Sequence, residues 1–330
     1  MKQTIYVFSN GELKRNNNTL YFDSETNKKY MPVENIGEML IFGEVTIGKK
    51  LLEFVSKNEI LLHFFNYYGY YVGTFYPREH YNSGHVILKQ SEFYLDPFKR
   101  LALARKFVSG AMVNIMKVLS YYNSRGKDLK SFIQGIDELT VKISEATDIE
   151  TLMSFEGNAR NYYYRAFNEI IDSKLFRFTE RTRRPPETML DALISFGNTL
   201  LYTTVLSEIY KTHLDPRIGY LHSTNFRSFT LNLDVAEIFK PIIVDRTIFS
   251  LLNKNVLKSG DFLKELNGVY LNEKGKKIFV QEYQDKLETT ITHKKLGREV
   301  SYRTLLRLEL YKIEKHIMND NEYHPYEAGW

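Results

Sequence analysis

One short stretch of this chain, residues 219–241, combines an imidazole with two carboxylates. His222 lies on a turn that begins at Gly219, and Asp234 and Glu237 follow it along the chain. Because these two acids are three residues apart, they share one face if the segment is helical. An imidazole with acidic oxygens is a ligand set for Mg²⁺ or Mn²⁺ that leaves positions open for phosphate oxygens. The stretch therefore suggests metal-assisted phosphodiester chemistry.

A further carboxylate, Glu156, is predicted to face an apolar interface. An unpaired charge in such a place is costly, so Glu156 must be protonated, paired with a base or bound to a cation. The structural alternative to a metal is an ion pair with Arg160, one helical turn further on. The apolar residues that share the helix face of Glu156 are Ile149, Leu152, Met153, Tyr163 and Phe167.

Each candidate ligand alone also has a structural explanation. A histidine on a turn is usually solvated or caps a helix, and Asp234 with Glu237 could form an acidic first turn that the helix dipole favours. The combination is more informative than its parts. A glutamate on a buried face, a turn histidine and a carboxylate pair together favour a coordination sphere with three or four ligands.

Basic side chains cluster around the candidate ligands. Arg181, Arg183 and Arg184 lie in one segment, and Lys211 and Arg227 flank the histidine turn. Cations beside a metal–carboxylate site favour binding of a phosphate backbone, so we predict that these five side chains contact DNA. The alternative for any one of them is a solvated charge on the surface.

The composition of the 330-residue chain limits the function classes. A net charge of +5 favours a polyanionic partner only weakly. Cysteine is absent, which excludes disulfides, zinc–thiolate sites and cysteine nucleophiles. No apolar run approaches the roughly 18 residues that span a bilayer, and the N-terminal apolar run is too short for a signal peptide. We therefore predict a cytoplasmic protein that does not act in a membrane.

The spacing of apolar residues divides the chain into two regions. Residues 1–75 contain short β-type runs separated by Gly and Asn, which predicts a small β-sandwich domain. Residues 76–95 are expected to be a linker, because Pro77 and Gly84 interrupt any period there. From residue 96 to residue 330 the period is near 3.6, which predicts a mainly α-helical catalytic domain and an α+β class overall.

Several helix boundaries are predicted in the second region. Asp96 followed by proline should begin a long helix that ends near Tyr122. Residues 147–150 match a capping box, and the prolines and glutamate at 185–187 should begin a further helix. The polar tail at 319–330 is expected to be loosely held.

Three blocks of this sequence match a known family. Residues 154–167 carry Glu-Gly-Asn-Ala-Arg followed by aromatics, and residues 183–201 carry Arg-Arg-Pro-Pro and Ala-Leu-Ile-Ser-Phe-Gly. Residues 214–241 carry Leu-Asp-Pro-Arg-Ile-Gly-Tyr-Leu-His and Leu-Asp-Val-Ala-Glu-Ile-Phe-Lys-Pro. These blocks resemble the CRISPR adaptation integrase family, the CRISPR-associated endonuclease Cas1. Asp191 and Asn198 stand where the family usually has Asn and Tyr.

The resemblance implies a function and a set of site residues. The metal ligands of the family fall on Glu156, His222 and Glu237, and Asp234 matches an acid that supports the site. The implied cofactor is Mg²⁺ or Mn²⁺, and the implied partners are double-stranded DNA, a second copy bound largely through the β domain, and Cas2, a small ferredoxin-like protein. The implied activity is DNA cleavage, and insertion of foreign DNA fragments as new spacers into the CRISPR array by transesterification.

Other functions stay open on the residues alone. A non-catalytic nucleic-acid-binding scaffold would keep the basic segments without needing the ligand set. A helical di-iron protein would need repeated Glu-x-x-His pairs, and none in this sequence fits that pattern. The motifs of nucleotide-driven, redox and serine-hydrolase enzymes are also missing.

Overall fold

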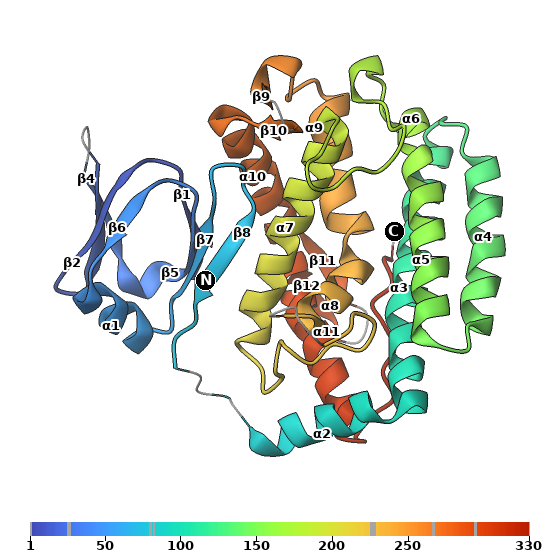
Figure 1. Ribbon diagram of the computed structural model, residues 1–330, viewed down its shortest axis with the longest axis horizontal. Helices are drawn as coiled ribbons and strands as arrows, with labels where there is room; N and C mark the ends of the chain where they lie inside the picture. The colour runs from blue at the N-terminus through green and yellow to red at the C-terminus, as the bar shows by residue number, and fades with distance from the viewer. Residues whose placement is uncertain are drawn as a thin grey trace. The chain divides into compact units, whose positions relative to one another are not determined.

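Figure 1 shows the computed structural model of the chain. It describes residues 2–24, 28–78, 81, 83–224, 229–265, 268–293 and 296–329. The chain divides into two compact units, Met1–His80 and Tyr81–Trp330. Strands predominate in the first unit and helices in the second, which confirms the predicted α+β class.

Two four-stranded sheets form the N-terminal unit. In the first sheet, three neighbouring strands are parallel and the last is antiparallel to its neighbour; in order these are β1 (Gln3–Val7), β5 (Ile36–Ile41), β7 (Leu61–Phe65) and β8 (Tyr71–Phe75). The second sheet is antiparallel except at its last pair; its order is β4 (Lys28–Pro32), β3 (Thr19–Asp23), β2 (Gly11–Asn16) and β6 (Val45–Ile47).

One apolar core joins the two sheets. Leu20 from the second sheet, Met39 and Leu62 from the first, and Val55 from helix α1 (Lys49–Lys57) are all fully buried in it. This packing of two sheets confirms the predicted sandwich. Strand β2 was not predicted, because its single buried residue, Leu13, lies among polar ones. A strand with one buried side chain has no clear two-residue period.

Helices form most of the second unit, and α3, α4 and α5 lie side by side in it (Figure 1). The longer helices are α2 (Gly84–Leu95), α3 (Pro97–Ser124), α4 (Lys130–Glu145), α5 (Ile149–Arg165), α7 (Met189–Ile209), α8 (Leu231–Phe239), α9 (Arg246–Asn253), α10 (Glu273–Glu288) and α11 (Tyr302–Ile317). The short α6 (Phe167–Ile170) follows α5, and a π-helical turn, Pro241–Asp245, joins α8 to α9. Two antiparallel hairpins complete the unit: β9 (Phe262–Glu265) with β10 (Gly268–Leu271), and β11 (Thr290–His293) with β12 (Arg298–Ser301).

The predicted linker is wrong in its second half, because α2 occupies residues 84–95. Ser83 caps this helix by accepting a hydrogen bond from the backbone N–H of Val86, and Val86, Gln90 and Phe93 are buried on one face. Gly84 was interpreted as a helix breaker. It lies at the first position of the helix, where a weak helix former disturbs little.

The helix boundaries were predicted with mixed success. Asp96 caps α3 as expected, accepting from the N–H groups of the next turn. The capping box at 147–150 is wrong, because Asp148 rather than Thr147 caps α5. The helix expected at residue 185 begins at Met189 instead, with Thr188 as its cap.

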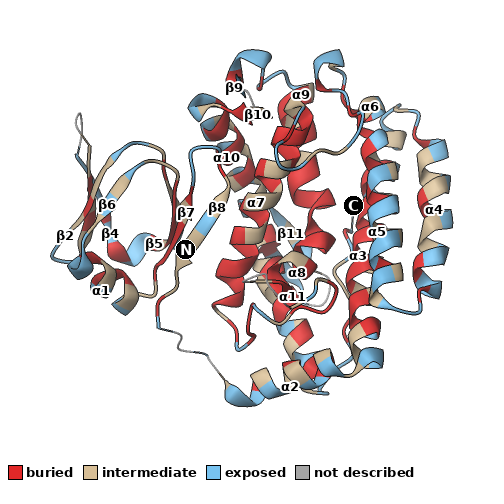
Figure 2. Cartoon of the chain, in the orientation of Figure 1, coloured by how far each residue is buried: buried red, intermediate tan, exposed pale blue. Residues whose placement is uncertain are grey.

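Burial is concentrated in α7 and α8 (Figure 2). Among the described residues, α7 is the one helix that is long and apolar enough to cross a membrane, and 72% of the relevant window is buried inside the protein. Such burial is that of a core helix in a globular domain.

The C-terminal tail is anchored, so the prediction of a loosely held tail is wrong for its described part. Tyr323 is fully buried, and its hydroxyl donates to Glu309 Oε1 at 2.5 Å. The backbone N–H of Ala328 donates to Asn114 Oδ1 at 2.8 Å, and the Asn114 amide donates to the Ile238 carbonyl at 2.9 Å. The tail is thereby connected through α3 to α8.

Candidate metal centre

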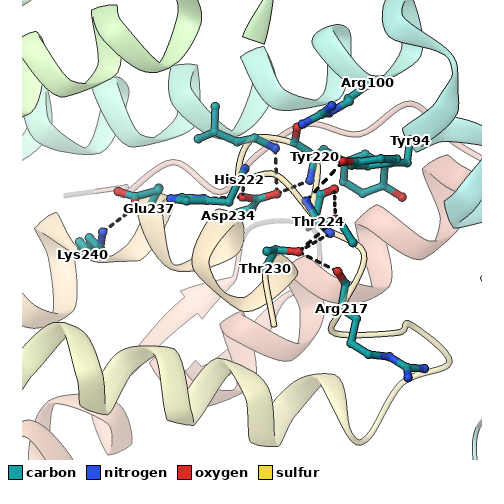
Figure 3. Close-up of polar contacts among 12 residues, drawn as sticks. Tyr94, Arg100, Arg217, Tyr220, His222, Thr224, Thr230, Asp234, Glu237 and Lys240 are labelled. Atoms are coloured by element: carbon teal, nitrogen blue, oxygen red, sulfur yellow. Dashed lines mark hydrogen bonds and ion pairs between the residues drawn. The ribbon is translucent and has the colours of Figure 1, made fainter. Parts of the chain in front are cut away.

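The carboxylate of Asp234, on α8, binds the residues of the histidine turn (Figure 3). This carboxylate is fully buried and accepts three backbone N–H bonds, from Tyr220 at 2.5 Å, Leu221 at 3.0 Å and His222 at 3.0 Å. It also contacts Nδ1 of the His222 ring at 2.7 Å. Asp234 is therefore not simply an acid in the first turn of a helix. It fixes both the backbone and the ring of the histidine turn.

Helices α2 and α3 hold the same loop from the other side. Gln90 on α2 pairs with the backbone of Asp215, accepting from its N–H at 2.7 Å and donating to its carbonyl at 3.2 Å. Arg100 on α3 donates to the Tyr220 carbonyl at 2.9 Å. The position of His222 thus depends on contacts from α2, α3 and α8.

The hydrogen bond to Asp234 decides which nitrogen of His222 can bind a ligand. Because Nδ1 faces Asp234, Nε2 is left for a ligand, as in the carboxylate–histidine–metal arrangement of many metalloproteins. Burial alone would lower the pKa of His222, but the Asp234 hydrogen bond and the nearby charge of Glu237 outweigh it and raise the pKa. Figure 3 shows the His222 ring extending toward Glu237.

Glu156 and Glu237 share one guanidinium. Arg160 Nε donates to Glu156 Oε1 at 3.2 Å, and Arg160 Nη2 donates to Glu237 Oε2 at 2.7 Å. The other oxygen of Glu237 accepts from Lys240 Nζ. Burial would raise the pKa of Glu237, but Lys240 and Arg160 outweigh it and lower the pKa to about 2. Glu237 is therefore an ionised carboxylate enclosed by cations.

The ion pair considered as an alternative for Glu156 is present in the structure. The helix face of Glu156 is less uniform than expected, because Leu152, Tyr163 and Phe167 are buried but Met153 is 40% exposed. Within the described ranges, no three His, Asp or Glu side chains are close enough to hold a metal in the present geometry. The two glutamates are thus gathered around Arg160, and not around an empty coordination sphere.

The chain was compared with known proteins. A sequence model described as "CRISPR associated protein Cas1" matches residues 5–285. The CRISPR-associated endonuclease Cas1 2 of Thermodesulfovibrio yellowstonii is 61% identical over 330 residues, which are 100% of this chain and 100% of the relative.

This chain belongs to the Cas1 family.

Solved structures agree with this membership. A Cas1 protein from Thermotoga maritima superposes with a TM-score of 0.89 at 45% identity, covering 98% of this chain and 100% of that one. A Cas6-RT-Cas1–Cas2 complex has the same fold, with a TM-score of 0.86 at 18% identity over 100% of this chain and 36% of that one. The function class predicted from the sequence, an endonuclease and integrase of CRISPR adaptation, is confirmed at the level of the Cas1 family.

The residues of this Cas1-family chain fit a divalent metal by their chemistry. Carboxylate oxygens of Glu156 and Glu237 are hard donors that suit Mg²⁺ or Mn²⁺, and neutral imidazole nitrogen also suits Mn²⁺. Oε2 of Glu156 and Nε2 of His222 have no hydrogen-bond partner among the described residues, so they are available for a ligand.

The predicted DNA contacts lie in different surroundings. Arg181 is largely buried and donates to Asp191 at 3.1 Å and Ser195 at 2.9 Å, so its guanidinium braces the start of α7. Lys211 is tied to Glu208 at 2.8 Å. The remaining three are Arg183 and Arg184, which are exposed, and Arg227, which lies outside the described residues.

Two residues of the site were missed at first. Lys240 is not among the predicted site residues, although a lysine three residues after Glu237 lies on the same helix face. Asp245 was not considered at all. Its position directly after the apolar run Pro-Ile-Ile-Val is a signal in the sequence that Asp245 is buried. A buried acid needs a specific partner, so such a residue is a candidate for the site.

Proposed function

We propose that Glu156, His222 and Glu237 hold one divalent cation, Mg²⁺ or Mn²⁺, and that this Cas1-family protein cuts and joins DNA there. The observation that carries the proposal is the Asp234–His222 pair at 2.7 Å, which directs Nε2 of the ring away from Asp234, while the ring extends toward Glu237. An imidazole oriented by a buried carboxylate is the usual arrangement of a metal-bound histidine.

The proposed reaction is an exchange of phosphodiester bonds. A 3′-hydroxyl oxygen of the incoming DNA forms a new bond to phosphorus, the bond from phosphorus to the 3′ oxygen of the array strand breaks, and the proton moves through solvent to the leaving oxygen. In cleavage, water takes the place of the 3′-hydroxyl. When bound, the metal supplies Lewis-acid stabilisation of charge on the phosphate.

The protein contributes orientation and charge. Asp234 keeps the proton of His222 on Nδ1, which leaves Nε2 as a donor of electrons. Lys240, buried beside Glu237, adds a fixed positive charge next to a proposed metal ligand, which would favour an anionic phosphate there. These groups are in place before DNA arrives, so little reorganisation is needed during the reaction.

The partners and location are proposed as well. Double-stranded DNA would contact the exposed Arg183 and Arg184, and the N-terminal unit would form the contact between two copies. A Cas2 protein would join them, as the name of the Cas6-RT-Cas1–Cas2 complex indicates for that assembly. We place the activity in the cytoplasm, where bacterial and archaeal DNA is found.

An integration assay tests the proposal. The substrates are a supercoiled plasmid with a CRISPR array and short duplex DNA, with Mn²⁺ and the Cas2 partner present. The wild-type protein should join the duplex to the plasmid, and Glu156→Ala should lose this activity while keeping the thermal midpoint within a few degrees. Full activity of folded Glu156→Ala would reject the site.

The same assay separates the enzyme from a DNA-binding scaffold. A scaffold would bind duplex DNA equally well in chelator and in Mn²⁺, and would neither cleave nor join it. Calorimetric titration of Mn²⁺ into wild type and Glu156→Ala provides a readout that does not depend on turnover. Binding to the wild type alone supports the enzyme.

A further inference from the structure

The core around Arg160 holds polar atoms that lack a hydrogen-bond partner among the described residues. They are Nη1 of Arg160, both carboxylate oxygens of Asp245 and the hydroxyl of Tyr163. Asp245 is 1% exposed and Tyr163 0%. Leaving a buried polar group without a hydrogen bond is unfavourable, so a cluster of such groups needs an explanation.

Asp245 is placed to act on Arg160. It ends the π-helical turn that follows α8, whereas Arg160 comes from α5. The Arg160 charge lowers the pKa of Asp245, and so does the nearby Tyr163 hydroxyl, although no hydrogen bond of good geometry joins Tyr163 to Asp245 among the described residues. Burial raises the pKa of Asp245 to about 7, although Arg160 and Lys240 pull it down. Within the described ranges, the Asp245 carboxylate therefore makes no hydrogen bond of good geometry.

The guanidinium of Arg160 lies between the two glutamates, where the proposed metal ion would bind. Both oxygens of Glu237 already contact positive groups, Oε2 through Arg160 at 2.7 Å and Oε1 through Lys240. Two positive charges bound to the same carboxylate oxygen repel each other strongly, and more so where water is excluded. A divalent ion and Arg160 therefore exclude each other at Oε2 of Glu237.

Arg160 cannot simply move into water when a metal arrives. The residue is 6% exposed, and a buried guanidinium without a partner is strongly unfavourable. In the described part of the helical unit, Asp245 is the buried carboxylate with both oxygens unpartnered. Nη1 of Arg160 also lacks a partner among the described residues, so Arg160 can supply the donor and Asp245 the acceptor that the other is missing.

We propose that Arg160 is a positioning residue with two places: it holds Glu156 to Glu237 before metal enters, and it moves from Glu237 to Asp245 when the metal binds. This inference rests on the metal site proposed above. It explains why the ligands are gathered around an arginine, since the arginine keeps two like charges together until the cation replaces it. It also assigns a role to Asp245.

A double-mutant cycle on Mn²⁺ affinity tests the inference. Calorimetry is carried out on the full chain as wild type, Asp245→Asn, Arg160→Gln and the double variant. Asp245→Asn should weaken Mn²⁺ binding about tenfold, which corresponds to about 1.4 kcal/mol, because the displaced guanidinium loses its anionic acceptor. Arg160→Gln should strengthen Mn²⁺ binding, because the competing cation is gone.

The decisive comparison is the effect of Asp245→Asn in the two backgrounds. In the Arg160→Gln background it should change the affinity less than about twofold, because no guanidinium needs an acceptor. Equal effects in both backgrounds, or no effect in the wild type, would overturn the inference. Glu208→Gln is the matched control: it also neutralises a fully buried acid paired with cations, and should leave Mn²⁺ affinity unchanged.

Two further results separate this inference from the proposed function. If the wild type binds no Mn²⁺, both the metal site and the exchange of Arg160 are rejected. If wild type binds Mn²⁺ and Glu156→Ala does not, the site is supported and Asp245→Asn alone decides the exchange. Should Arg160→Gln fail to fold, a crystal structure with Mn²⁺ decides: a guanidinium within about 3 Å of Asp245 supports the exchange. An Arg160 guanidinium that still bridges Glu156 and Glu237 in the Mn²⁺-bound structure overturns the inference.

Discussion

Two buried glutamates of the helical unit, Glu208 on α7 and Glu237 on α8, have similar pKa values but different surroundings. Burial would raise the pKa of Glu208, but Lys211 at 2.8 Å, Arg303 at 2.8 Å and Arg307 at 2.7 Å outweigh it and lower the pKa to about 2. Burial is likewise outweighed at Glu237, where the pKa is also lowered to about 2.

The two clusters differ in whether the groups around the glutamate have all their hydrogen-bond partners. The cations around Glu208 connect α7 to α11, and two of them are about one-third exposed and reach water. Around Glu237, one buried nitrogen of Arg160 and both carboxylate oxygens of Asp245 have no hydrogen-bond partner in the described part of the chain. A fully paired cluster stabilises one packing of helices, whereas a partly paired one retains the ability to exchange partners.

The largest expected contrast is catalytic. Glu237→Gln removes a proposed metal ligand, so DNA joining per folded molecule should fall at least about a thousandfold, since metal stabilisation of charge is worth several kcal/mol. Glu208→Gln should stay within about twofold of wild type. The integration assay with Mn²⁺ measures both, normalised to folded protein. Equal losses would mean that the two clusters do not differ in function.

Stability should respond in the Glu208 cluster. Glu208→Gln leaves three cations without their common carboxylate, so the free energy of unfolding should fall by about 3 kcal/mol. Urea unfolding followed by circular dichroism measures it. A change below about 0.5 kcal/mol would show that the cluster does not hold α7 to α11.

A smaller effect is expected at the support of His222. Asp234→Asn keeps the shape of the side chain but removes its charge, so Mn²⁺ affinity should fall about 10–100-fold. Binding calorimetry measures the loss, and proton NMR of the His222 ring should report a changed tautomer. An unaltered affinity would leave Asp234 with a role in the loop backbone alone.

The last contrast concerns the pH dependence of stability. The pKa of Asp245, about 7 in the folded protein, lies above its unfolded value of 3.8, so the folded state binds a proton that the unfolded state has lost. The free energy of unfolding should therefore decrease as pH rises from about 4 to about 7, by up to about 1.4 kcal/mol per unit. Asp245→Asn should flatten this slope. The lowered pKa of Glu237 affects a different pH range: the stability that ionised Glu237 contributes is lost as pH falls from 4.5 toward about 2.

The local elements were predictable where one short-range signal dominates. The Asp96-Pro97 start of α3 and the 3.6-residue period behind it identified that helix correctly. Elements that form only by pairing with another segment were not predicted. The hairpin of β11 and β12 carries few buried residues, so its sequence has little period, and its strands exist because each supplies the other's backbone hydrogen bonds.

The candidate site divides in the same way. Its motifs allow the carboxylates and the histidine to be proposed as metal ligands, because their chemistry is a property of residue type. The sequence also suggested the Glu156–Arg160 pair, which lies within one helix turn. It could not indicate that the same guanidinium reaches Glu237, because those two residues are on different helices.

The amino-acid sequence by itself determined the α+β class, the family and the acids and imidazole that could bind a metal, because composition, periodicity and motif spacing are local properties of the chain. The tertiary structure alone decided that Arg160 lies between two glutamates, that Asp245 is buried without a hydrogen-bond partner among the described residues and that Asn114 connects the tail to α8. These features depend on helices distant in sequence packing together, which removes water and makes each remaining charge depend on its neighbours.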